Sequence, residues 1–175
     1  MAALPLDACT LINLVASGVP LKEISNAVDC DFVVTTIAAA ESLFVFGEGE
    51  GDDVVLVSVE GLEERGHLQI TTLTELELAL YVELARSLDD GEASTLAVAR
   101  QRNTDVATDD RRAMRVASEL GLLVITTSQL LRAWADQTGP TPNALRDAIT
   151  GVQRRGNFIP ARNDPERQWW TQHSP

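Results

Sequence analysis

Short apolar segments alternate with longer helical patterns along most of this sequence, and this alternation constrains the fold more than any other feature. The segments 32–36 (FVVTT) and 122–126 (LLVIT) are almost entirely apolar or β-branched. Strands of this kind, separated by helices of about 10–15 residues, are typical of parallel sheets with helices on both faces. The sequence therefore predicts an α/β fold in three layers, with a mainly parallel central sheet of buried strands.

The same patterns place the other elements. Strands are expected at 2–8, 32–36, 54–57, 68–72, 106–108 and 122–126. Helices are expected at 11–17, 21–28, 37–46, 60–65, 73–87, 91–103, 111–120, 129–137 and 143–154. The glycine- and acid-rich segment 47–53 (GEGEGDD) is expected to be a loop.

Composition indicates a single folded domain. The chain has 175 residues, of which 45% are hydrophobic and 23% charged, and it contains no repeat or low-complexity linker. We expect a main domain over 1–138 and a helical extension with a tail over 139–175, packed on the same domain. The N-terminus has no basic segment of the secretory type, and no apolar run reaches the ~20 residues that span a bilayer. A soluble, cytoplasmic protein without membrane contact is expected.

The charge is unevenly distributed. The net charge is −12; residues 1–110 contain 21 acidic and 5 basic residues, whereas residues 111–175 contain 5 acidic residues and 9 arginines. Such a balance argues against sequence-independent nucleic-acid binding by the whole surface. A local basic face in the C-terminal third remains compatible with it.

Acidic residues stand at the points where chemistry is expected in this fold. Ligands of open α/β sheets bind outside the carboxyl ends of the strands. A cluster of carboxylates without a nearby lysine repels itself unless a divalent cation neutralises it, and all-oxygen ligation suits Mg²⁺ or Mn²⁺. These ions activate water for attack on a phosphodiester. The candidates are Asp7 after the first strand, Glu41 in an apolar helix, Glu92 at the start of helix 91–103, and Asp109 and Asp110 after strand 106–108.

Several segments resemble the successive motifs of a known family. They are DACTLINL (7–14), the isolated Glu41, DDGEASTLAVA (89–99) and VATDDRRAMRVASELGLLVITTSQLL (106–131). Together they resemble the PIN-domain family and, within it, the VapC-like toxins of type II toxin–antitoxin modules. The resemblance runs from about Asp7 to Leu131.

The resemblance implies a Rossmann-like sandwich and an Mg²⁺- or Mn²⁺-dependent endoribonuclease. It also implies an RNA substrate, a cognate antitoxin protein as partner, and a homodimer. The implied catalytic and metal-binding residues are Asp7, Glu41, Glu92 and Asp110, with Asp109 as the alternative fourth ligand and Thr108 orienting a carboxylate. Glu92 is one methylene longer than the aspartate common elsewhere in the family, and Cys9 stands where Ser, Thr or Asn is usual. Segment 47–57 and the tail beyond Thr138 have no clear counterpart in the minimal toxin.

Each candidate also has a structural interpretation. Glu92 suits the first turn of a helix, and Asp109 and Asp110 are good N-caps, so that one is expected to be a cap and the other a ligand. Arg111, Arg112 and Arg115 flank the site and either hold phosphates or are surface charges. Cys9 and Cys30 are expected to be small buried residues. Trp169 and Trp170 either clip the tail to the body, stack on bases or dock a partner, and Trp134 is expected in the core.

Two competing functions follow from the same residues. A PIN-like scaffold that binds a protein or nucleic-acid partner without turnover fits the acidic first two thirds of the chain. Phospho-acceptor folds also use acids at strand ends, but they need a lysine beside them. Lys22 is the only lysine, and its position before the second strand does not fit.

Overall fold

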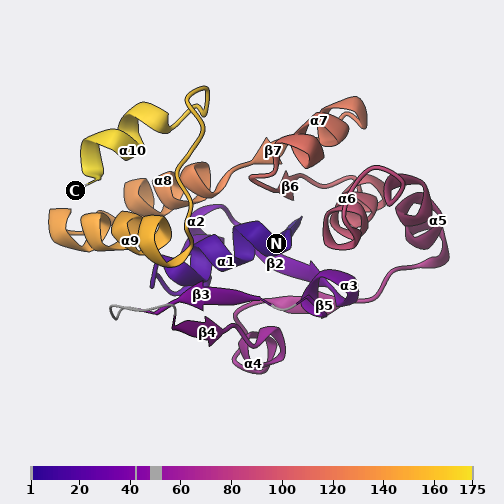
Figure 1. The fold of residues 1–175 in the computed structure, drawn as a ribbon, viewed down its shortest axis with the longest axis horizontal. Helices are drawn as coiled ribbons and strands as arrows, with labels where there is room; N and C mark the ends of the chain where they lie inside the picture. The colour runs from indigo at the N-terminus through magenta and orange to yellow at the C-terminus, as the bar shows by residue number, and fades with distance from the viewer. Residues whose placement is uncertain (1, 42, 48–52, 175) are drawn as a thin grey trace.

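The computed structural model describes residues 2–41, 43–47 and 53–174 (Figure 1). The strands are β1 (Ala2–Pro5), β2 (Cys30–Thr35), β3 (Phe44–Phe46), β4 (Val54–Leu56), β5 (Gln69–Thr71), β6 (Val106–Ala107) and β7 (Val124–Ile125). The first five helices are α1 (Ala8–Ala16), α2 (Leu21–Ala27), α3 (Thr36–Ala39), α4 (Val59–Glu64) and α5 (Glu75–Leu84). The other helices are α6 (Asp90–Arg102), α7 (Arg111–Glu119), α8 (Thr127–Thr138), α9 (Pro142–Arg155) and α10 (Arg167–His173).

The central sheet is parallel. Strand β2 pairs with β1 on one side and β5 on the other, and β6 pairs with β7. A parallel bridge between Leu6 and Ala107, together with a 3.1 Å hydrogen bond from Asp7 N to Ala107 O, joins the two groups of strands. The resulting order is β5-β2-β1-β6-β7. Strands β2 and β5 are added on one side of β1, and β6 and β7 on the other, so the order of connection switches between β1 and β6 while all the strands stay parallel. The carboxyl ends of β1 and β6 therefore flank the switch point, where open α/β sheets bind their ligands.

Helices cover both faces of the sheet, as the sequence predicted. One face packs on α1, α2 and α8 through a core that includes Leu4, Leu6, Phe32 and Val34. The other face is covered by α6, which contacts β1, β2 and β6 and is flanked by α5 and α7. In Figure 1, α5 and α6 gather at one end of the molecule and α8, α9 and α10 at the other.

Helix α6 lies close to the sheet because its inner positions are small. Ala93, Ser94 and Ala97 are fully buried. The Ser94 hydroxyl is 2.7 Å from the Thr35 hydroxyl at the end of β2. This close packing fixes the first turn of α6 relative to the carboxyl ends of the strands.

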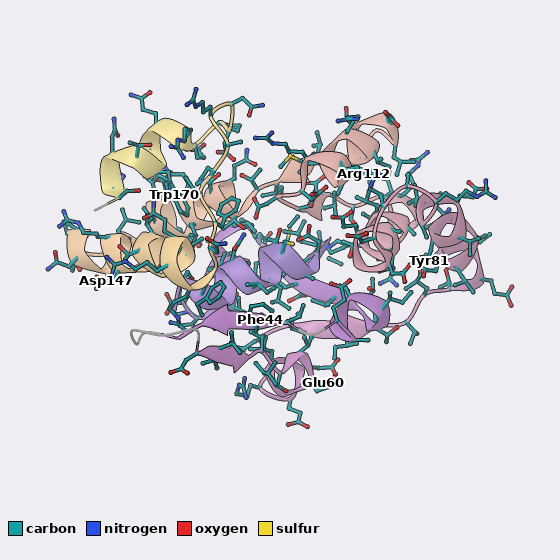
Figure 2. All side chains as sticks on the ribbon, in the orientation of Figure 1. Phe44, Glu60, Tyr81, Arg112, Asp147 and Trp170 are labelled. Atoms are coloured by element: carbon teal, nitrogen blue, oxygen red, sulfur yellow. The ribbon has the colours of Figure 1, made fainter. Side chains whose placement is uncertain are left out.

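The C-terminal segment completes the core on the face of the sheet that packs on α1, α2 and α8. Trp169 and Trp170 on α10 are buried, and the Trp170 ring meets Phe158 edge to face at 6.1 Å. Figure 2 shows Trp170 between α10 and α9, which are in contact. Helix α10 was not expected from the sequence, whereas Trp134 lies in the core as predicted. The division at residue 138 stays a prediction.

Three expectations about the elements need correction. The predicted helix over 37–46 is wrong: α3 ends at Ala39, and β3 forms an antiparallel hairpin with β4. The predicted buried strand over 122–126 is the two-residue edge strand β7, half-buried and preceded by Leu123, which is 71% exposed. The first strand ends at Pro5, because Asp7 already caps α1.

Part of the expected loop over 47–53 lies outside the described residues, at 48–52. Its two ends are paired, since Gly47 N donates to Asp53 O at 2.8 Å. Among the described residues, no helix combines the length and apolarity that a bilayer crossing requires.

Candidate active site

Asp7 is held at the junction between β1 and α1. Its carboxylate caps α1, with Thr10 N donating to Oδ1 at 2.7 Å. The Thr108 hydroxyl donates to Oδ2 from the end of β6. Asp7 is only 2% exposed, and this burial raises its pKa to about 6 even though the hydrogen bonds from Thr108 and Thr10 act in the opposite direction. Asp7 therefore keeps its proton to a higher pH than an ordinary aspartate, and a nearby cation would favour its charged form.

Asp110 lies beside this pair and caps the next helix. Its amide donates to Thr108 Oγ1 at 3.1 Å, so that the hydroxyl links Asp7 and Asp110. Asp110 Oδ1 accepts from the amides of Arg112 and Ala113, at 2.7 and 2.9 Å, at the start of α7. Oδ2 accepts no hydrogen bond from the described part of the chain, which leaves it available to a ligand.

Asp109 has a different role, although it is adjacent. Its Oδ1 accepts from Thr127 N at 3.0 Å, and its Oδ2 accepts from Asn13 Nδ2 at 3.0 Å and from the Thr127 hydroxyl. Burial raises the pKa of Asp109, and these hydrogen bonds oppose the shift. Asp109 thereby joins α1, β6 and the start of α8, and both of its oxygens are already used. The helix cap expected at this pair is Asp110, which is also the acid whose second oxygen accepts no hydrogen bond within the described residues. The cap and the available oxygen are therefore not divided between the two acids as the sequence predicted.

Glu92 completes a group of three carboxylates. It is the third residue of α6, and its side chain accepts a hydrogen bond from the amide of Asp89, the N-cap. Desolvation raises the pKa of Glu92 to about 7, with further contributions from the negative charges of Asp110, Asp89 and Asp7. Asp7 and Asp110 therefore both act on Glu92 through their negative charges.

Glu41 is not part of this group. It is exposed, and it follows α3 rather than lying within a helix. Its carboxylate accepts from Gly91 N at the start of α6, and a Cβ at position 91 would be 2.1 Å from Glu41 Oε1. The acids that raise its pKa, after desolvation, are Asp89 and Asp90. The structure thus attaches Glu41 to the residue before Glu92, outside the group of three.

Cys9 does not match its expected environment. The residue is exposed instead of buried, and Cys30 is half-buried. Desolvation of the Cys9 thiol, followed by the charges of Asp7 and Glu92, raises its pKa to about 12. The thiol is therefore protonated at neutral pH and is a poor nucleophile.

The donor chemistry of the site fits a hard divalent cation. Asp7, Glu92 and Asp110 offer carboxylate oxygens whose mutual repulsion a cation would relieve. Within residues 2–41, 43–47 and 53–174, however, no three acidic, cysteine or histidine side chains are already close enough together to form a metal-binding group. The fit is therefore one of chemistry and position, and ion binding would require the carboxylates to approach one another.

Two residues around the site were missed by sequence reasoning. Asn13 and Thr127 bind Asp109 and are buried, at 3% and 0% exposure. Asn13 could have been noticed as a polar residue on the apolar side of helix 11–17. Arg111 and Arg112 lie at the start of α7 as expected, are exposed, and form no ion pair with any described residue. Figure 2 shows Arg112 on α7.

A family model described as a PIN domain matches residues 7–163, from Asp7 through the groups assembled above. The chain belongs to the PIN-domain family. PIN domains are generally nucleases and usually use divalent metal ions, so that the fold of this chain is of a nuclease type. The PIN-like α/β/α fold expected from the sequence is confirmed.

Other comparisons add little to this assignment. No curated protein matches the chain. Among solved structures, the chain is similar to a PilT N-terminus domain protein from the hyperthermophilic archaeon Sulfolobus solfataricus P2. The identity is 17% and the TM-score 0.40, over 77% of this chain and 93% of that one. A likeness at this level carries no argument about function.

Proposed function

We propose that this PIN domain is an Mg²⁺- or Mn²⁺-dependent endoribonuclease of the VapC-like branch, the toxin of a toxin–antitoxin pair that acts in the cytoplasm. The observation that carries the proposal is geometric: Asp7 and Asp110 follow the neighbouring strands β1 and β6 at the switch point of the sheet, and the Thr108 hydroxyl links them. The negative charges of both also act on Glu92 at the start of α6. The resemblance of segments 7–14, 89–99 and 106–131 to VapC-like motifs supports the choice of branch. An RNA substrate, a cognate antitoxin and a homodimer are parts of the same proposal.

The three acids would hold the ion, and the residues around them would keep them in place. Thr108 donates to Asp7 and accepts from the amide of Asp110, so that one hydroxyl sets the positions of both carboxylates. Glu92 is held by the first turn of α6, and Glu41 is the fourth acid of the proposal, bound to the neighbouring Gly91.

A bound Mg²⁺ or Mn²⁺ would activate a water and offset the charge that develops on the phosphate. Asp7 and Glu92, whose pKa values are raised, would lose their protons as the ion binds. The exposed guanidinium groups of Arg111 and Arg112 would bind phosphates of the RNA beside Asp110. Asp109 would not bind the ion. It would position the end of β6 through its hydrogen bonds from Thr127 and Asn13.

The test is cleavage of single-stranded RNA in Mg²⁺, in Mn²⁺ and in chelator. Asp110→Asn keeps the N-cap, because asparagine caps helices as well as aspartate does. It removes the charge of the free oxygen, and we expect a loss of cleavage of at least about 100-fold with little change in stability. Asp147→Asn, an exposed site on α9 far from Asp110, is the matched control and should cleave at the wild-type rate.

The competing function is a binding scaffold without turnover. The position of Glu41 outside the group of three carboxylates favours it. A wild-type protein that cleaves no RNA in either ion would establish the scaffold in place of the nuclease. Equal cleavage by wild type and Asp110→Asn would contradict the site.

A further inference from the structure

A groove of about 800 Å³ opens beside Asp109, between helix α7 and the segment 158–165, which we call the tail wall. Asp109 lines this groove, and the proposed metal ligand Asp110 follows it in the chain. The residues that the argument uses are Arg111, Met114 and Arg115 on α7, and Ile159, Asn163 and Asp164 on the tail wall. A volume of this size lies in the range of about 300–1,000 Å³ that is usual for small-molecule sites.

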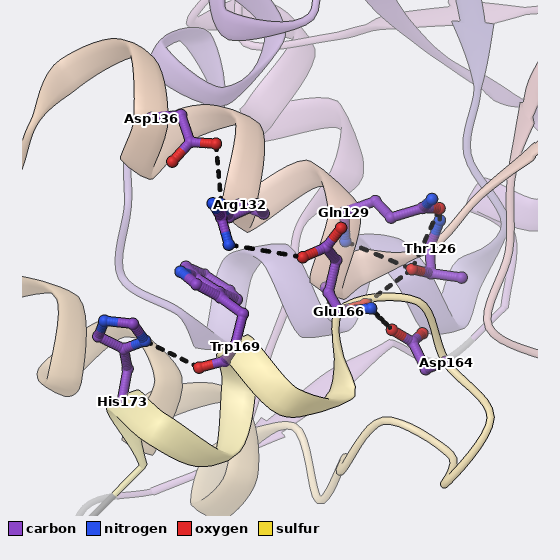
Figure 3. Close-up of polar contacts among 9 residues, drawn as sticks. Thr126, Gln129, Arg132, Asp136, Asp164, Glu166, Trp169 and His173 are labelled. Atoms are coloured by element: carbon purple, nitrogen blue, oxygen red, sulfur yellow. Dashed lines mark hydrogen bonds and ion pairs between the residues drawn. The ribbon is translucent and has the colours of Figure 1, made fainter.

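The tail wall is fixed to the helix that holds Asp109. Asp164 Oδ1 accepts from the Ser128 hydroxyl at 2.7 Å and from Glu166 N at 2.8 Å. Ser128 follows Thr127, the partner of Asp109, so that consecutive residues of α8 bind the site and the tail wall. Figure 3 shows how the tail continues along α8, where Glu166 is 3.7 Å from Arg132, whose guanidinium lies 5.3 Å above the Trp169 ring.

The lining combines free cations with apolar and amide groups. Arg111 and Arg115 are exposed and form no ion pair within the described residues. The two carboxylates of the groove, Asp109 and Asp164, are engaged by hydrogen bonds from neighbouring groups. Across the groove, Ile159 exposes 58% of its surface, although large apolar side chains are usually buried.

We propose that this groove binds the nucleotide of a single-stranded RNA adjacent to the cleaved phosphate, with Arg111 and Arg115 on its phosphates and Ile159 against its base. The inference rests on the proposed function and names a specificity site for it. The lining suits a nucleotide, because guanidinium groups bind phosphate, apolar side chains pack on a base, and the Asn163 amide can both donate and accept at a base edge. Single-stranded RNA exposes its bases to such contacts, unlike a duplex.

The charge distribution favours an anionic strand, such as a nucleic acid, over a basic ligand at this groove. All 9 basic residues after position 110 are arginines, against 5 acids, while the rest of the chain has 21 acids and 5 bases. An RNA strand that approaches the site is thus repelled by most of the surface and attracted to α7 and the tail. This directs the strand into the groove that Asp109 lines.

The experiment measures the affinity of the full chain for a fluorescein-labelled single-stranded RNA of twelve random nucleotides, in chelator, as a function of salt. Arg115→Gln should weaken binding about 5- to 10-fold and lower the slope of log K against log salt by about 0.7, the value for one phosphate contact on a single strand. Ile159→Ser should weaken binding about 3- to 10-fold without changing the slope. Arg86→Gln, an exposed arginine outside the groove, is the control and should match the wild type.

Cleavage products identify the position that the groove reads. In Mn²⁺, Ile159→Ser should change the preferred nucleotide at one position next to the cut. If the wild type cleaves RNA but neither variant changes affinity or cleavage preference, the groove proposal is wrong and the nuclease stands. If the wild type neither binds nor cleaves RNA, the proposed function fails and the groove proposal fails with it. Both substituted residues are exposed, and unchanged thermal unfolding of the variants would exclude an effect through folding.

Discussion

Asp109 and Asp110 are adjacent in the sequence, yet their carboxylates meet different partners. Asp109 binds the start of α8 and Asn13 with both oxygens, whereas Asp110 uses one oxygen for the cap of α7. The strand end alone does not distinguish them, because both follow β6 directly. The sequence could therefore predict an acidic pair here, but the assignment of roles depends on Asn13 and Thr127, which are 96 and 18 positions from Asp109.

Both carboxylate oxygens of Asp109 accept hydrogen bonds, so its substitution by asparagine should lower the stability of the fold. Asp109→Asn replaces one acceptor oxygen by an amide group that faces Thr127 N or Asn13 Nδ2, both donors. We expect the free energy of unfolding to fall by about 1–3 kcal/mol, the cost of an unsatisfied buried donor. Urea unfolding measures it, with Asp110→Asn as the matched control, which should change by less than about 0.5 kcal/mol. Equal losses in both variants would contradict the separate roles.

Helix α6 shows how one element assembles residues from distant segments. Its first turn binds Glu92 through the amide of Asp89 and Glu41 through the amide of Gly91. The approach of Glu41 requires glycine, since any β-carbon at 91 would meet its carboxylate. The partial positive charge of a helix N-terminus stabilises both glutamates there.

Gly91→Ala tests whether this position of Glu41 matters. The substitution should displace the Glu41 carboxylate, while alanine favours the helix by up to about 1 kcal/mol. We therefore expect unchanged or slightly higher stability together with reduced RNA cleavage. Glu41→Gln should reduce cleavage similarly, and the double variant should be no worse than either single one, because both act on the same contact. Additive losses would show that Gly91 acts independently of Glu41.

Most elements were predictable because local patterns and tertiary packing agree in them. The strands near 32–36 and 106–108 and the helices near 91–103 and 111–120 are present within a few residues of their expected bounds. The segment 37–46 was mistaken for a helix because a short apolar run fits both periodicities, and its pairing with Val54–Leu56 decides the outcome. Helix α10 depends on burial of its tryptophans against α8 and α9, which no local signal reveals.

At the scale of the whole molecule, the site makes stability depend on pH and, if the proposed ion binds there, on that ion. The pKa values of Asp7 and Glu92, about 6 and 7, exceed the usual unfolded values of about 3.9 and 4.3. The folded chain thus binds protons more tightly, and these groups lower stability as pH rises from about 4 to about 7. A divalent ion that binds only the folded, deprotonated site reverses this loss.

Thermal unfolding in chelator and in Mn²⁺ at pH 5 and pH 8 checks this linkage. At pH 8 we expect Mn²⁺ at 100 times its Kd to stabilise by about 2.7 kcal/mol, which is roughly 5–10 °C for a domain of this size. At pH 5 the shift should be much smaller. Glu92→Gln keeps an acceptor oxygen at this position of α6, so it should raise the Tm in chelator at pH 8 and remove most of the metal shift. An absent shift at pH 8 in several millimolar Mn²⁺ would count against the carboxylate group.

The bridge between β1 and β6 has a consequence for the kinetics of folding. The hydrogen bonds that build the site join residues 101, 96 and 114 positions apart, so that nearly the whole chain must be in place before Asp7, Asp109 and Thr127 meet. Contacts of such long sequence separation form slowly, because a large loop must close first. A nascent chain on the ribosome that ends before β6 therefore has Asp7 and Glu92 but no assembled site. The proposed nuclease could therefore cleave RNA only after the last strands of the sheet have emerged.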